Sequence, residues 1–114
     1  MSKFDEKVEL YTKDIEKFNN GICDVELLKK VVKGLGPSIY NNDSERVSCS
    51  DNEELARVRE NFLKKKLSLT NSDEELDQSI KEVCEQLGSA NKNKFRATFY
   101  YLLVEKYGAE AVYA

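Results

Sequence analysis

The chain has 114 residues, of which 40% are hydrophobic and 34% charged, so it can bury a core and is too rich in apolar residues for a disordered segment. Its net charge of -3, from 18 cationic and 21 anionic side chains, argues against a dedicated nucleic-acid binder, which is normally strongly basic. The chain lacks histidine, the side chain that most often acts as general acid, general base or metal ligand. These features favour one non-catalytic domain over residues 1–114, without a metal or another cofactor.

The longest apolar run, residues 99–104, is far shorter than the roughly 18 residues that a membrane-spanning helix needs. The first ten residues, MSKFDEKVEL, are charged from the third onward and lack the apolar stretch of a secretory signal. We therefore expect a cytoplasmic protein that does not enter a membrane. The three cysteines, Cys23, Cys49 and Cys84, show no C-x-x-C spacing, and we expect them to be free thiols.

Two helices are predicted in the first third of the chain. Ser2 can cap the first helix with an acid, Asp5, at its third position, and apolar residues then recur at helical spacing until about Gly21. Asp24 can cap the second helix, which should end with Gly34 in its last turn.

The stretch KGLGPSIY, residues 33–40, raises the question of a phosphate-binding loop. It matches neither G-x-x-x-x-G-K-[ST] nor G-x-G-x-x-G, so we interpret it as a hinge between helices. Gly36 can turn the chain, and Pro37 has the fixed φ that suits the first residue of a short helical turn. Ile39 and Tyr40 should anchor this turn in the core.

A third helix should begin at one of two overlapping capping boxes, Ser50 with Glu53 or Asp51 with Glu54, and end near Leu67. The three lysines KKK, residues 64–66, fall at the end of this helix. Cations at that end complement the helix dipole, which explains the run without a ligand.

The last two helices complete the predicted fold. The fourth begins with the capping box of Ser72 and Glu75 and stops at Gly88. The fifth should run from about Asn91 to Tyr107, and its middle, FYYLLV, is apolar on nearly every side, which predicts a central position. Without strand alternation or hairpin signals, the sequence indicates an all-α, single-domain bundle of about five helices with a short extra turn after Pro37.

Several runs together resemble a known family. SKFDEKVELYT, KGLGPSIYN, VSCSD, ENFLKKKL, and EVCEQLGS followed by FRATFYYLLVEKY are similar to the domain of unknown function 2853 family of small bacterial proteins. The likeness covers nearly the whole chain. It implies a compact all-helical protein with no assigned activity, cofactor or catalytic residue, so no functional residue is carried over from it.

The start of the last predicted helix carries an unusual cluster of cations. Lys92, Lys94 and Arg96 would lie within its first turn and a half, where free N–H groups already create positive potential. With the hydroxyl of Ser89, they form a candidate anion-binding site for a phosphate group or an acidic partner. In the alternative interpretation these cations are solvated, or are neutralised by acids of the preceding helix.

Four tyrosines near the C-terminus, Tyr100, Tyr101, Tyr107 and Tyr113, form a candidate interface, because tyrosine is enriched at protein–protein contacts as well as at amphipathic core positions. We therefore expect a protein partner or self-association. Anion or nucleic-acid binding through the cationic cluster is the alternative. An enzyme is a third option, but Cys49 has no base to activate it.

Overall fold

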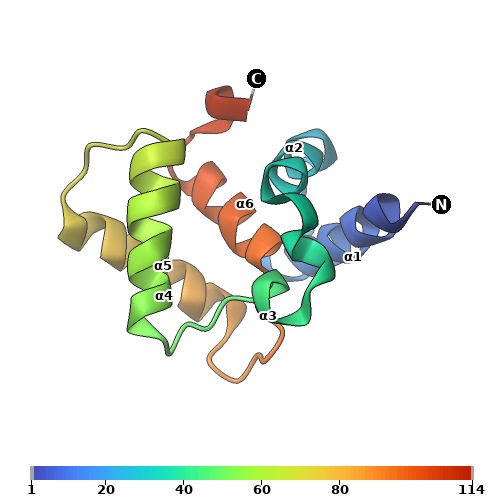
Figure 1. The fold of residues 1–114 in the computed structure, drawn as a ribbon, viewed down its shortest axis with the longest axis horizontal. Helices are drawn as coiled ribbons and strands as arrows, with labels where there is room; N and C mark the ends of the chain where they lie inside the picture. The colour runs from blue at the N-terminus through green and yellow to red at the C-terminus, as the bar shows by residue number, and fades with distance from the viewer. Residues whose placement is uncertain (1, 114) are drawn as a thin grey trace.

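The helix α6 (Arg96–Lys106) occupies the centre of the fold, and α1, α2, α3 and α5 pack against it (Figure 1). Seven of its residues are buried, which confirms the predicted central position: Ala97, Thr98, Phe99, Tyr101, Leu102, Leu103 and Val104. This computed structural model describes residues 2–113. Within that range the fold is all-α, as predicted, and contains one isolated β-bridge but no strand.

The first two helices begin where their caps predict. The Ser2 hydroxyl accepts the N–H of Asp5 at 3.1 Å at the start of α1 (Lys3–Phe18), which ends slightly before the predicted Gly21. At the start of α2 (Val25–Leu35), Asp24 accepts the N–H of Leu27 at 3.2 Å. Each side chain satisfies a backbone donor that the first helical turn would otherwise leave free.

The Gly-Pro stretch is a hinge, as predicted, with differences in detail. Gly36 ends α2 with a φ of 62°, a left-handed conformation that glycine adopts without strain, and η1 (Gly36–Tyr40) is the 3₁₀ turn that Pro37 favours. Ile39 is buried, but the prediction that Tyr40 is buried was wrong, because 48% of it is exposed. The sequence also did not predict α3 (Asn42–Glu45), which Asn41 caps.

The third predicted helix consists of two parts. Asp51 caps α4 (Asn52–Arg57), and the chain continues into the π-helix η2 (Val58–Lys66), which ends just before Leu67, as predicted. Val58, Phe62 and Leu67 are buried at intervals of four and five residues. This spacing fits the i→i+5 hydrogen bonds of a π-helix and keeps these side chains on one face.

The helix α5 (Asp73–Leu87) follows its predicted boundaries, with Ser72 as cap and Gly88 as stop, but the prediction that the last helix starts near Asn91 was wrong. Residues 91–95 instead pair with another loop: the N–H of Val47 donates to the carbonyl of Lys94 at 2.8 Å, beside the Arg46–Phe95 bridge. These partners are distant in sequence, so helical spacing could not reveal them. A final 3₁₀ helix, η3 (Glu110–Tyr113), follows α6.

A disulfide joins Cys49, in the loop before α4, to Cys84 on α5, with an S–S distance of 2.11 Å. The prediction of three free thiols was therefore wrong for these two, whereas Cys23 is free. The fold brings the two α-carbons to 6.0 Å across 35 residues of sequence, which no local spacing rule detects.

Among the described helices, none combines the length and the apolar character needed to cross a bilayer.

Candidate ligand-binding site

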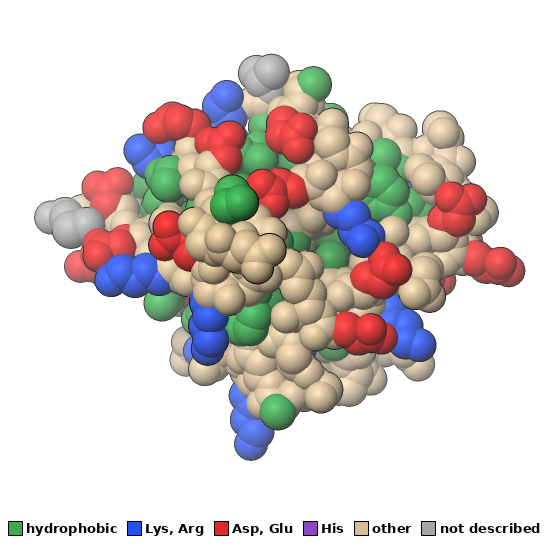
Figure 2. Space-filling view, turned by 180° about the vertical axis from the view of Figure 1, so that it is seen from behind, with side chains coloured by type: hydrophobic (Ala, Val, Ile, Leu, Met, Phe, Trp, Pro, Cys, Tyr) green, Lys and Arg blue, Asp and Glu red, His purple; other side chains and the backbone are tan. Residues whose placement is uncertain are grey.

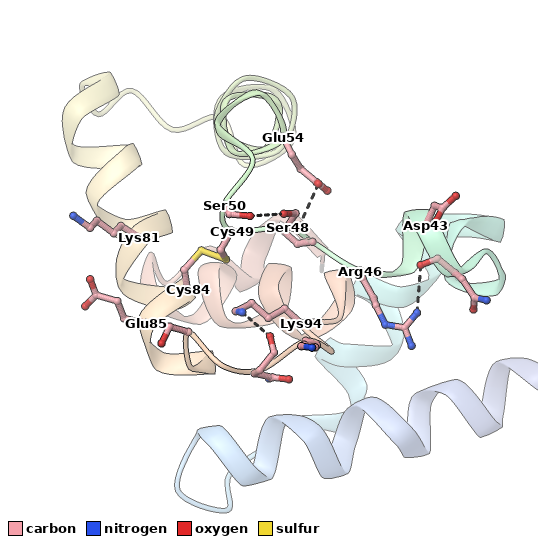
Figure 3. A pocket seen from close by; sticks show the side chains of 15 residues that line it. Asp43, Arg46, Ser48, Cys49, Ser50, Glu54, Lys81, Cys84, Glu85 and Lys94 are labelled. Atoms are coloured by element: carbon pink, nitrogen blue, oxygen red, sulfur yellow. Dashed lines mark hydrogen bonds between the residues drawn. A yellow bond between two sulfur atoms is a disulfide. The ribbon is translucent and has the colours of Figure 1, made fainter.

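A pocket with a volume of about 680 Å³ lies beside the disulfide, between the loops that precede α4 and α6 and one side of α5 (Figure 3). This volume falls within the range of small-molecule sites. Its wall contains charged, hydroxyl and amide side chains from four segments of the chain. They are Asn42, Asp43, Arg46, Val47, Ser48, Cys49, Ser50, Glu54, Lys81, Cys84, Glu85, Ser89, Asn91, Lys92 and Lys94.

A second pocket, of about 460 Å³, lies next to the first. Cys49, Lys81 and Cys84 line both pockets. The disulfide is therefore part of the wall that separates them.

Lys94 is the buried cation of the larger pocket. Only 8% of it is exposed, and its ammonium donates one hydrogen bond, to the carbonyl of Asn91 at 2.6 Å. Among residues 2–113, no carboxylate lies within 4.0 Å of this ammonium. Lysine is almost never buried to this degree without an anionic partner, and an ammonium has three N–H donors. Lys94 therefore brings an unpaired charge and unused donors to the pocket.

The loop that carries Lys94 is held in place by hydrogen bonds at several points. The side chain of Asn91 donates to the carbonyl of Leu87 at 3.1 Å and accepts the N–H of Asn93 at 2.9 Å. The backbone of Lys94 is bonded to Val47, as described above. These contacts fix both ends of residues 91–94, and the hydrogen bond to Asn91 holds the ammonium against the same loop.

The other charges around the pocket are more exposed. Arg46 donates to Asn93 Oδ1 at 3.2 Å, and its guanidinium lies 5.6 Å from the centre of the Phe95 ring. Lys81 and Lys92 are exposed. The lining thus contains four cations against three carboxylates, and one of these carboxylates, Glu54, already pairs with Arg96 outside the lining.

Arg96 serves the fold. Its Nη2 lies 2.5 Å from Glu54 Oε1, and its guanidinium also donates to the carbonyls of Ser44 at 2.8 Å and Arg46 at 3.2 Å. Burial alone would lower its pKa, but hydrogen bonds to Tyr100 and Glu54 raise the pKa above its ordinary value. These bonds tie the first turn of α6 to α3 and α4.

The candidate anion-binding residues are therefore divided. Ser89, Lys92 and Lys94 line one pocket, whereas Arg96 does not. Lys92 and Lys94 lie on a loop before α6. The prediction that they are cations in the first turn of the last helix was therefore wrong. Sequence reasoning missed Arg46, Lys81 and the disulfide, because only tertiary contacts bring them to this pocket.

The candidate interface tyrosines all make contacts within the fold. The ring of Tyr100 stacks on Phe62 with centroids 3.9 Å apart, and the hydroxyl of Tyr107 lies 2.6 Å from Ser79 Oγ. Tyr101 is fully buried. Tyr113 is partly buried, and burial raises its pKa to about 12. Self-association through these residues stays a prediction.

The lysine run of residues 64–66 is largely engaged. Lys64 pairs with Glu60 at 2.8 Å and with Asp73 at 2.6 Å, and the ammonium of Lys66 lies 5.0 Å from the centre of the Tyr113 ring. These contacts fit the structural interpretation of the run.

Within residues 2–113, no group of three or more His, Cys, Asp or Glu side chains is arranged to hold a metal ion.

Fold and site together define an all-α domain with a pocket lined by charged side chains and a disulfide. Residues 10–111 match the family described as "Protein of unknown function (DUF2853)", so the chain belongs to that family. This match confirms the resemblance carried by the sequence motifs. No protein with a curated description matches the chain. The family description names no activity, so inferences about function depend on the chemistry of the pocket.

Proposed function

We propose that this protein binds a small organic anion, with a carboxylate or phosphate group, in the pocket beside the disulfide. The observation that carries this proposal is Lys94, a residue only 8% exposed whose ammonium has no carboxylate partner among the described residues. A buried charge without a counter-charge is costly to the folded state. An anionic ligand would supply that counter-charge.

Neighbouring groups support the same ligand chemistry. The Ser89 hydroxyl can donate to an oxyanion, and Lys92 adds a second positive charge at the rim. Asp43 and Glu85 line the same pocket, so a ligand that also carries an ammonium or hydroxyl groups would find partners there. The lining therefore suits a small zwitterionic or polyhydroxylated acid better than a simple inorganic ion.

A small molecule suits the site better than a nucleic acid. The pocket volume of about 680 Å³ corresponds to one small ligand, whereas a nucleic-acid strand is bound along an extended basic groove. On the face shown in Figure 2, acidic and basic side chains are interspersed among apolar ones, without an extended basic area among the residues described there. The net charge of -3 points in the same direction.

We also propose that the protein works in the cytoplasm, where a thiol such as that of Cys23 stays reduced. A disulfide is rare in that compartment unless it is transient or takes part in redox chemistry. This location therefore makes the chemistry of Cys49 and Cys84 relevant to function.

The binding proposal is tested by titrating isotopically labelled protein with inorganic phosphate, citrate and glutathione at low ionic strength. We expect saturable amide shifts in residues 88–94 and around Val47 for at least one of these anions. The variant Lys94→Met should lower the affinity at least about tenfold, because a charge-assisted contact in a buried site is lost.

The matched control is Lys30→Met, which removes an exposed lysine of α2 outside the pocket. It changes the net charge by the same amount as Lys94→Met and should leave the affinity for the anion unchanged. A short single-stranded DNA serves as the competing probe. Saturable binding of the DNA with no response to the small anions would overturn the proposal. An equal loss of anion affinity in Lys94→Met and Lys30→Met would also overturn it.

A further inference from the structure

The Cys49–Cys84 disulfide lies where a small molecule can reach it. Both cysteines line the large pocket and also the second pocket beside it. Figure 3 shows the S–S bond on the pocket wall, between the loop that holds Ser48 and Ser50 and the helix that carries Lys81 and Glu85. Structural disulfides are commonly enclosed by the core, whereas exposed disulfides are the ones that exchange with external thiols.

We propose that this disulfide is a thiol–disulfide exchange site, and that its substrate is a low-molecular-weight thiol bearing carboxylate groups that enters through the large pocket. The choice of an anionic thiol rests on the proposed function, because Lys92 and Lys94 of the same pocket would bind its carboxylates. The accessibility of the disulfide does not depend on that proposal.

The proposed reaction consists of two successive thiol–disulfide exchanges. The thiolate of the small molecule attacks Sγ of Cys49, and a bond between these two sulfurs forms while the Cys49–Cys84 bond breaks. The bonding electron pair leaves with Sγ of Cys84, which takes a proton from water. A second molecule of the same thiol then attacks the mixed disulfide, releases the oxidised thiol as a dimer and leaves two protein thiols.

The surroundings of the two sulfurs favour attack at Cys49. Cys49 is half-buried in a turn between Ser48 and Ser50, whose hydroxyl groups are exposed. Cys84 is 9% exposed and belongs to the apolar stripe of α5, with Val83 and Leu87 buried beside it. An adduct on Cys49 can occupy the pocket, whereas an adduct on Cys84 would have to fit against the core.

Opening the disulfide also changes the site. Cys49, Lys81 and Cys84 form the lining shared by the two pockets, so breaking the bond removes a covalent part of the wall between them. The loop before α4 then loses its covalent link to α5. The oxidised and reduced forms would therefore offer ligand sites of different size.

The test measures how fast the disulfide is reduced in the folded protein, in a Cys23→Ser background that removes the remaining thiol. Glutathione, 2-mercaptoethanol and cysteamine serve as anionic, neutral and cationic thiols. Free cysteines are trapped by alkylation and located by peptide mass. Each rate is divided by the rate of the same thiol with urea-unfolded protein, so that intrinsic nucleophilicity cancels.

We expect the folded protein to react within about tenfold of the unfolded rate, as an accessible disulfide should, with the first mixed disulfide on Cys49. Glutathione should have a relative rate roughly threefold or more above that of cysteamine, the size of change that screened charges produce. Lys92→Glu should remove this preference. Lys30→Glu, with the same change in charge at an exposed site outside the pocket, should keep it.

The possible failures are distinct. Protection of the folded disulfide by more than roughly a hundredfold would mean that it opens only on unfolding, and would overturn the exchange site while leaving anion binding untouched. Equal relative rates for the three thiols would overturn anionic recognition, and with it the proposed function, while the exchange site would stand. If all three cysteines of the wild-type protein can be alkylated without prior reduction, Cys49 and Cys84 are not bonded to each other. That result would also overturn the exchange site.

Discussion

Arg96 and Glu54 connect the start of α6 to α4 through a contact of 2.5 Å between Nη2 and Oε1, with 18% and 15% of their side chains exposed. The same guanidinium donates to two backbone carbonyls, those of Ser44 and Arg46. This one side chain therefore ties α6 to two segments, α3 with its C-cap and α4. A mostly buried ion pair of this kind is costly to break from one side.

Arg96→Met should lower the free energy of unfolding by about 2–4 kcal/mol, because Glu54 and two carbonyls lose their donor. Urea denaturation monitored by circular dichroism measures this loss. Lys92→Met, at an exposed position, should change stability by less than about 0.5 kcal/mol. Similar effects of the two substitutions would contradict the role given to Arg96.

Tyr101→Phe should lower the free energy of unfolding by about 1–2 kcal/mol. The hydroxyl of Tyr101 accepts the N–H of Asp24 at 2.8 Å and donates to Glu105 at 2.8 Å, so its removal leaves both groups without this partner. The matched control is Tyr40→Phe, at a tyrosine that is 48% exposed. Thermal unfolding of both variants provides the comparison, and a larger effect at Tyr40 would refute the prediction.

Lys94→Met should leave the free energy of unfolding unchanged or raise it by up to about 1 kcal/mol, because it replaces a buried lysine that has no carboxylate partner among residues 2–113 with an apolar side chain of similar length. The same variant should lose anion binding. Such a gain in stability with a loss of function is typical of binding-site residues. A loss of more than about 1 kcal/mol in urea denaturation would instead show that Lys94 mainly holds its loop together.

Cys23 should react slowly with alkylating reagents. Burial, which is the main cause, raises the pKa of its thiol to about 11, so little thiolate exists near neutral pH. At pH 8 we expect alkylation on the order of a hundredfold slower than for an ordinary thiol, and a rate that increases with pH up to about 11. Intact-mass kinetics measure this rate, with urea-unfolded protein as reference. A rate independent of folding would contradict the prediction.

Asp14 should make the protein more stable as the pH falls through the pKa of its carboxyl group. Burial raises this pKa above 3.8, although a hydrogen bond of 2.7 Å from the hydroxyl of Thr98 opposes the shift. In the window between the raised pKa and 3.8, the folded protein binds a proton that the unfolded chain does not, which stabilises the fold.

The variant Asp14→Asn removes this titration. It should be more stable than the wild type at neutral pH, and the difference should shrink as the pH falls through the window defined above. Urea denaturation at a series of pH values measures the difference. A difference that stays constant over that range would show that the Asp14 carboxyl does not contribute in this way.

Local signals in the sequence were sufficient for most helix boundaries. Ser2, Asp24, Asp51 and Ser72 each accept a backbone N–H two or three residues further along, so the cap and its partner lie within one short stretch of sequence. The apolar content of FYYLLV likewise predicted the central helix, since a helix that is apolar on nearly all sides must be enclosed.

The features that the sequence did not predict depend on distant contacts. The last helix starts late because residues 91–95 pair with the loop at Val47, and Cys49 lies next to Cys84 only because α4 and α5 pack together. The residues of the pocket were difficult to predict for the same reason. Ser89, Lys92 and Lys94 could be selected because they lie close together in sequence, whereas Arg46 and Lys81 reach the pocket from other segments.

The pocket is built mainly from two irregular segments, residues 46–51 and 88–95, which meet at the single bridge between Arg46 and Phe95. Their amides lack the continuous ladder that protects α5 and α6, so they should exchange hydrogen for deuterium sooner than those of the central helices. The fold thus places irregular backbone around the pocket that holds Lys94 and the disulfide. A bound molecule that bridges the two segments would slow this exchange without any change in the surrounding helices.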